Sequence, residues 1–228
     1  MIRRDFFKAP LVLAGVSLGS RSVSAQTEPP KAPGLTRYIA DFIVRTKYED
    51  IPADVIALGK KTLLDGFGLA LAGSASPAGP IVRQYVATLG APPARSATIV
   101  GTTAKAAPRF AAFANGLSIH ADDYDDTGSS LHVTAPVLPA AYALCEVDRR
   151  SGKDLMLAFH VGVEVASKIG DAMPPRHDHD GFHTTGTYGS FGSAAACAKL
   201  RGLDATQTAY SLGLADRKST RLNSSHRT

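Results

Sequence analysis

Residues 52–72, PADVIALGKKTLLDGFGLALA, repeat apolar side chains at the spacing of an α-helix. Pro52 occupies a position that the first turn of a helix accepts, and Gly73 directly after the stretch predicts the helix end. The repeating apolar positions are Val55, Ile56, Leu63, Leu64, Phe67 and Leu71. We therefore predict one long amphipathic helix here.

The flanking sequence predicts more helices and one short strand. Ser151 with Asp154 resembles a capping box, and Asp204 is a typical N-cap. The small residues of 185–200 would allow a neighbouring helix to approach closely. Predicted helices cover residues 35–45, 80–89, 106–119, 136–149, 151–171, 185–200 and a last segment from 204; residues 96–100 predict the strand. The expected fold class is all-α, a helical bundle.

The first 34 residues predict an export signal and a mobile linker. Arg3 and Arg4 precede two phenylalanines, a short apolar run and the small-residue site Val23-Ser-Ala25. This order is typical of a secretory signal over residues 1–25, and the paired arginines favour the twin-arginine route. The Pro-rich residues 26–34 predict a linker. We expect a periplasmic or exported protein with no membrane association after signal removal.

The other end, residues 216–228, has no apolar period. Its first eleven residues match the translation of a common sequencing adapter, so we expect an artefact there and a natural chain that continued past Ala215. Residues 1–25 and 216–228 each carry a net charge of +3, which leaves −1 for the rest of the +5 total. The basic character thus belongs to the ends, and no nucleic-acid partner is expected. Cys145 and Cys197 predict buried free thiols.

The strongest candidate for chemistry is His120-Ala-Asp-Asp-Tyr-Asp-Asp-Thr127, between two apolar segments. Four carboxylates in five positions repel one another, so burial beside the core would indicate a functional role. A solvated acidic loop is the alternative. A calcium loop fails because Thr134 stands where a bidentate glutamate belongs. A transition-metal site, as in a metal-dependent hydrolase, stays open for His120, Asp123 and His132, without a recognised spacing.

Two further histidine segments follow the acidic cluster. His132 lies in a loop before the helix at 136 and reads as either structural or catalytic. In Arg176-His-Asp-His-Asp-Gly-Phe-His183, His177 and His179 predict exposed loop residues. His183 lies just before a helix, where a neutral imidazole and the helix N–H groups could bind an anion.

These segments resemble the MmgE/PrpD family. The resemblance rests on Ala114-Asn-Gly-Leu-Ser-Ile-His120 with the acids that follow, on Val137-Leu-Pro-Ala-Ala141, and on Gly181-Phe-His-Thr-Thr-Gly-Thr187 leading into the small-residue helix. It covers about residues 35–215. It implies a helical domain, incomplete here and truncated before an α/β lid domain, in a homodimer that needs no metal or organic cofactor.

The resemblance also suggests roles. The active-site Asp and Thr of decarboxylase-like members match Asp123 and Thr127, and their histidines match His132 and His183; the loop before His132 is one residue shorter here. The family's lysines would lie beyond Ala215.

We expect a lyase, a dehydratase or decarboxylase, that removes a proton alpha to a carboxylate of a small polycarboxylate. His183 and His132 would act as acid and base, Asp123 and Thr127 would orient, and Asp125, Asp126 and His120 would support. The chain as given would be inactive. The alternatives are an iminodisuccinate-type epimerase or isomerase, and a non-catalytic periplasmic binding protein.

Overall fold

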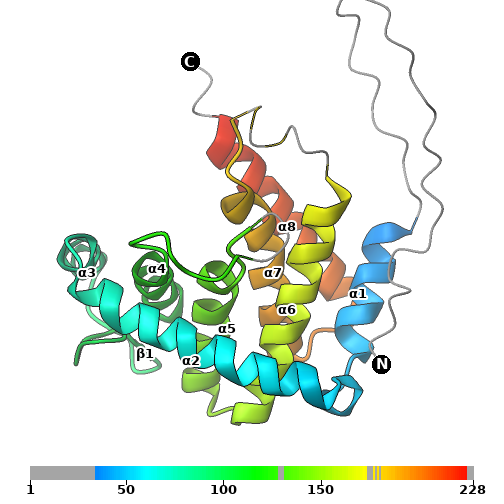
Figure 1. Ribbon diagram of the computed structural model, residues 1–228, viewed down its shortest axis with the longest axis horizontal. Helices are drawn as coiled ribbons and strands as arrows, with labels where there is room; N and C mark the ends of the chain where they lie inside the picture. The colour runs from blue at the N-terminus through cyan, green and yellow to red at the C-terminus, as the bar shows by residue number, and fades with distance from the viewer. Residues whose placement is uncertain (1–33, 128–130, 174–176, 178, 180, 225–228) are drawn as a thin grey trace, which may run out of the picture.

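The computed structural model describes residues 34–127, 131–173, 177, 179 and 181–224 and confirms the all-α class. The predicted signal, most of the predicted linker, and Arg176 lie outside the described residues. Figure 1 shows α2 crossing in front of α4, α5 and α6. The helices are α1 Leu35–Arg45, α2 Ala53–Ala75, α3 Ala78–Thr88, α4 Pro108–Ile119, α5 Thr134–Asp148, α6 Gly152–Ala172, α7 Thr184–Arg201 and α8 Ala205–Ser224, with a 3-10 turn, η2, at Tyr48–Asp50.

The centre of the bundle is the packing of α5, α6 and α7. Phe159 of α6 and Leu138 of α5 are almost completely buried there. Gly162 of α6 faces Gly192 of α7 so closely that a Cβ on Gly192 would lie 2.8 Å from the Gly162 carbonyl oxygen. The small residues of α7 therefore allow close approach of a neighbouring helix, as their composition predicted.

The predicted end of α2 at Gly73 is wrong, because the helix continues to Ala75. The reason for the glycine lies in another helix: a Cβ on Gly73 would collide with the carbonyl group of Ser118 in α4. Gly73 is thus a contact point between α2 and α4, and not a stop signal.

Two predicted helix starts are confirmed by their side-chain caps. Ser151 and Asp154 form the reciprocal capping box that begins α6, and the Asp204 carboxylate accepts backbone N–H bonds at the start of α8. That last helix extends to Ser224, past Ala215, since it contains no proline and no glycine follows Gly213 within it.

The predicted strand is shorter than expected and has an unexpected partner. β1, Ala97–Thr98, pairs antiparallel with β2, Lys105–Ala106. Asn115 of α4 holds this hairpin, since its side chain accepts from Val100 N and donates to the Thr98 carbonyl.

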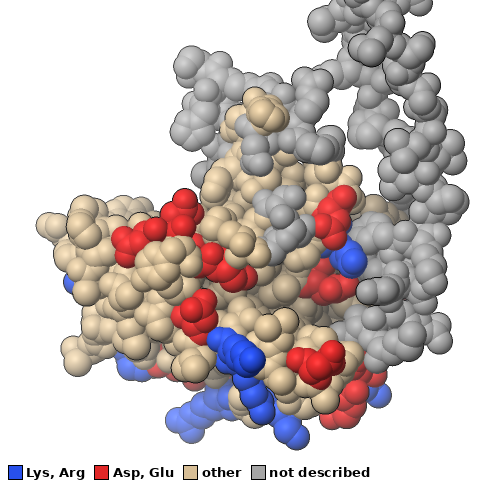
Figure 2. Space-filling model, in the orientation of Figure 1, with Lys and Arg blue, Asp and Glu red and all other residues tan. Residues whose placement is uncertain are grey.

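Surface features complete the description. On the face drawn in Figure 2, acidic side chains are spread over the surface and Lys and Arg lie mainly along the lower edge, a mixture typical of solvated surfaces. Among the described residues, no helix has both the length and the apolar character needed to cross a membrane. Cys145 and Cys197 are free thiols.

Candidate functional site

The loop between α4 and α5 carries the acidic cluster. His120 follows the last residue of α4, and Asp123 adopts a left-handed backbone conformation with φ 54°, which aspartate tolerates better than most residues. At the other end of the loop, Asp126 Oδ1 accepts the backbone N–H of Thr134, the first residue of α5. The loop is therefore fixed at both helix ends.

Asp125 is the buried centre of the site. Its side chain has 0% exposure, and its Oδ1 lies 2.8 Å from Nδ1 of His120 and 3.2 Å from Nδ1 of His132. The backbone oxygen of Asp125 also lies 3.3 Å from His132 Nδ1. Asp125 thus contacts two imidazole rings, each through its Nδ1 atom.

Asp123 lies on the opposite side of the two rings. Its Oδ1 is 3.6 Å from Nε2 of His132 and 3.9 Å from Nε2 of His120, and its side chain is 76% exposed. Only part of the acidic cluster is therefore buried. Asp125 is buried and Asp126 is partly buried, whereas Asp122 and Asp123 are exposed. Of the two exposed carboxylates, that of Asp123 lies at the open side of the site.

A third imidazole, His183, extends the row. The ring centroids of His120 and His132 are 4.9 Å apart, and those of His120 and His183 are 5.9 Å apart. His183 is exposed and is the N-cap of α7, where its Nδ1 accepts the backbone N–H of Gly186 at 3.3 Å. It thus uses one of the helix N–H groups that were expected to bind an anion.

The hydrogen bonds assign different tautomers to the three rings when they are neutral. An ionised carboxylate and a carbonyl oxygen only accept, so Nδ1 of His120 and His132 carries the proton and Nε2 has a free lone pair. Nδ1 of His183 accepts a bond, so its proton is on Nε2. The site therefore offers two imidazole bases and one imidazole acid.

The other candidate residues lie around this row. Thr127 is exposed in the loop after Asp126. His179 is exposed, as predicted, but His177 is partly buried: it packs on Phe182 and its Nε2 lies 2.9 Å from Thr187 Oγ1. The prediction of an exposed His177 is wrong, because its ring is covered by aromatic neighbours.

Two functional candidates were missed from the sequence. Thr185 of α7 is buried and accepts the backbone N–H of His132 through Oγ1 at 3.0 Å, which ties the His132 loop to α7. Arg109 of α4 lines the same groove, of about 490 Å³, as His120 and His183. Arg109 precedes His120 by about three helical turns, or ~16 Å, so helical spacing alone would have placed both on one face.

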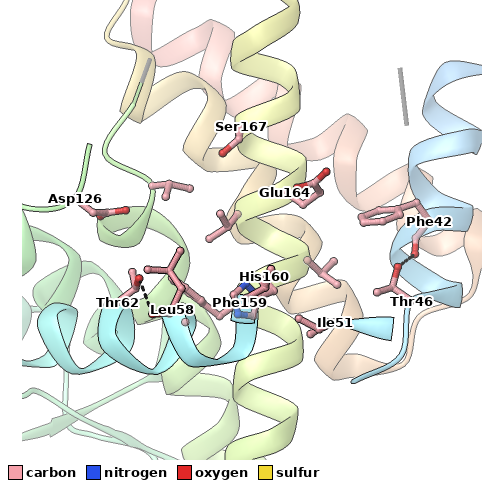
Figure 3. Close-up of a pocket in the computed structure, with 15 residues that line it drawn as sticks. Phe42, Thr46, Ile51, Leu58, Thr62, Asp126, Phe159, His160, Glu164 and Ser167 are labelled. Atoms are coloured by element: carbon pink, nitrogen blue, oxygen red, sulfur yellow. Dashed lines mark hydrogen bonds between the residues drawn. The ribbon is translucent and has the colours of Figure 1, made fainter. Parts of the chain in front are cut away.

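A second pocket, of about 310 Å³, lies between α1, α2 and α6. In Figure 3 the Asp126 carboxylate enters it from one side, opposite Phe42 and Thr46. Burial raises the pKa of Asp126 and of Glu164, and burial lowers the pKa of His160. Burial therefore disfavours the charged form of each of these groups. The described residues that line the pocket include no lysine or arginine, so it suits a polyanion poorly.

Sequence comparisons relate this chain to known proteins. The profile of the MmgE/PrpD N-terminal domain matches residues 37–228. The chain is 34% identical to human cis-aconitate decarboxylase over 193 residues, and 34% identical to cis-aconitate decarboxylase of Aspergillus terreus over 191 residues. It is 32% identical to a cis-aconitate decarboxylase-like protein of Aspergillus oryzae over 198 residues.

These matches cover unequal shares of the two chains. They include 79% to 80% of this chain but only 38% to 39% of the relatives. The chain therefore spans about two fifths of the length of the curated relatives it matches, and all three rings and Asp125 lie inside the matched domain.

Proposed function

The chain belongs to the MmgE/PrpD family, and from this premise we propose that its helical domain provides the acid and base of a lyase for small polycarboxylates. The observation that carries the proposal is the position of the His120 ring, whose centroid lies 4.9 Å from that of His132 and 5.9 Å from that of His183, beside buried Asp125. The hydrogen bonds at Nδ1 of His132 and His183 imply opposite tautomers for these two rings. The names of the relatives favour a substrate related to cis-aconitate.

In a dehydration, Nε2 of His132 takes the proton from the carbon alpha to a carboxylate. The C–H electron pair forms the double bond, the bond to the β-hydroxyl breaks, and Nε2–H of His183 protonates the leaving oxygen to give water. Proton exchange with solvent then removes the extra proton from His132 and returns one to His183. In a decarboxylation, the C–C bond to the carboxylate breaks, CO2 leaves, and the acid protonates the remaining carbon. Dehydration therefore uses both groups, whereas decarboxylation uses only the acid.

The remaining side chains act on this pair. Asp125 stabilises the positive charge that His132 gains on taking a proton, because its carboxylate lies beside Nδ1 of that ring. Asp123 and Thr127 at the open side orient substrate, and Asp126 positions the loop through Thr134. His120 lies next to each of the other two rings and supports both.

Binding and turnover are tested separately. We expect cis-aconitate, citrate or 2-methylcitrate to shift the ring C–H NMR signals of His120, His132 and His183, and a monocarboxylate of similar size to leave them unchanged. Turnover is followed as CO2 release or as change of the vinyl proton signal. If no polycarboxylate moves these three signals, the substrate class is wrong. If a polycarboxylate shifts these signals but a protein of the same length as the relatives does not turn it over, a non-catalytic binding protein is favoured.

Two properties of the whole protein belong to the same proposal. We propose export through the signal at residues 1–25 and function as a homodimer without an obligatory cofactor. Fractionation of cells and measurement of the mass in solution test these two points.

A further inference from the structure

We propose that His120, His132 and Asp123 bind a divalent transition-metal ion such as Zn²⁺, with Asp125 orienting both imidazoles from behind. One donor atom from each of these four residues can be chosen so that all lie within 4.8 Å of one another. Two imidazoles and one carboxylate are a ligand set that Zn²⁺ takes in sites with an open fourth position.

The distances favour Nε2 as the donor of each ring. Asp123 Oδ1 lies 3.6 Å and 3.9 Å from the two Nε2 atoms. Donor atoms on a tetrahedral ion with bonds of about 2.0–2.1 Å are about 3.3 Å apart. The two distances from Asp123 Oδ1 are therefore only about 0.3 Å and 0.6 Å longer than the separation of two ligands on such an ion.

Asp125 would orient the two metal-binding rings through the ring nitrogens that do not face the ion. A histidine that binds a metal ion usually donates its other ring N–H to a carboxylate or carbonyl group, and Asp125 accepts at Nδ1 of both rings. Its Oδ2 is buried and, among the described residues, has no hydrogen-bond partner. A carboxylate buried this completely is costly without nearby positive charge, and a dication held by both rings would supply that charge.

The donor types select the class of ion. Calcium and magnesium prefer oxygen ligands, whereas imidazole nitrogen suits zinc, copper, nickel and iron. A bound ion would occupy Nε2 of His132 and so exclude it from proton transfer. Binding itself does not require the proposed lyase activity, and the test below uses no turnover.

The test is a titration of the untagged, chelator-treated chain with Zn²⁺ by calorimetry and with Co²⁺ by its visible absorption. We expect one ion per chain at this site. Asp123→Asn and His132→Gln should weaken binding at least about tenfold, and Asp125→Asn should weaken it by about 10-fold to 100-fold. Asp122→Asn, an exposed neighbour, and His179→Gln, an exposed histidine, should leave the affinity unchanged.

Circular dichroism of each variant separates loss of a ligand from loss of the fold. If His132→Gln unfolds, the Asp123→Asn variant decides the result. This variant should stay folded, because the Asp123 side chain is 76% exposed and asparagine tolerates the same backbone conformation. Absence of Zn²⁺ binding, or binding that survives both Asp123→Asn and His120→Gln unchanged, overturns the proposal.

Discussion

Oδ1 of Asp125 lies 2.8 Å from Nδ1 of His120, inside a bundle where the Asp125 side chain has no exposed surface. A short bond from an imidazole to a buried carboxylate fixes the orientation and the tautomer of the ring. The same oxygen lies 3.2 Å from Nδ1 of His132, so one side chain orients two rings. The site therefore depends on Asp125 as much as on the exposed Asp123.

Asp125→Asn should lower kcat by about 100-fold or more with a smaller change in KM. Asparagine keeps the shape but removes the charge that stabilises protonated His132, and its NH2 group can only donate toward a ring nitrogen. Steady-state kinetics of the protein at the full length of the relatives, with the polycarboxylate that the NMR titration identifies, measures the effect. Asp122→Asn is the matched control and should stay within about twofold. A kcat near the unsubstituted value would remove Asp125 from the mechanism.

His183 has two separable roles, and two substitutions distinguish them. Asparagine is a good N-cap, so His183→Asn should keep the start of α7 and lose the acid. His183→Ala should lose both, with a further loss of about 1 kcal/mol in the free energy of unfolding, or about 2–4 °C in Tm. Both variants should lose about 100-fold or more in kcat. An active His183→Asn variant would show that the imidazole acts only as a cap.

Local rules were sufficient for most of the fold. The apolar period predicted α1 at its observed bounds, and the Ser151 and Asp154 pair predicted the start of α6. Gly73 was misread because its neighbour, Ser118, is distant in the sequence. A glycine at a helix end and a glycine at a helix crossing look the same until the second helix is placed.

The candidate site was predictable in composition but not in arrangement. The residue types and their motifs identified the acidic loop, His132 and His183. No local rule shows that Asp125 points inward while Asp123 points to solvent, since both lie in one irregular loop. The bond from His132 N to Thr185 joins residues 53 apart in sequence and becomes visible only in three dimensions.

Glu164→Gln should stabilise the protein at neutral pH. Burial raises the pKa of Glu164 above its ordinary value of 4.5, so the folded state holds this proton more tightly than the unfolded chain. Stability from this group is complete below pH 4.5 and is lost as the pH rises through the folded pKa. The gain of Glu164→Gln over the unsubstituted protein should therefore be absent at about pH 4 and present at about pH 7.

Urea unfolding midpoints across this range measure the difference. Glu49→Gln is the control, because Glu49 is exposed and should show no such change with pH. An equal effect of both substitutions would mean that overall charge, and not burial of Glu164, determines the trend.

Gly192→Ala and Gly68→Ala should change stability in opposite directions, although both add one methyl group to a helix. A Cβ at Gly192 would lie 2.8 Å from the Gly162 carbonyl oxygen and from Val137, whereas a Cβ at Gly68 meets nothing within 4 Å. The first forces α6 and α7 apart and should cost about 1–3 kcal/mol. The second removes backbone freedom from the unfolded chain and should add about 0.4–1 kcal/mol. Thermal unfolding of the two variants compares them directly, and a stable Gly192→Ala variant would mean that the α6–α7 contact can relax without cost.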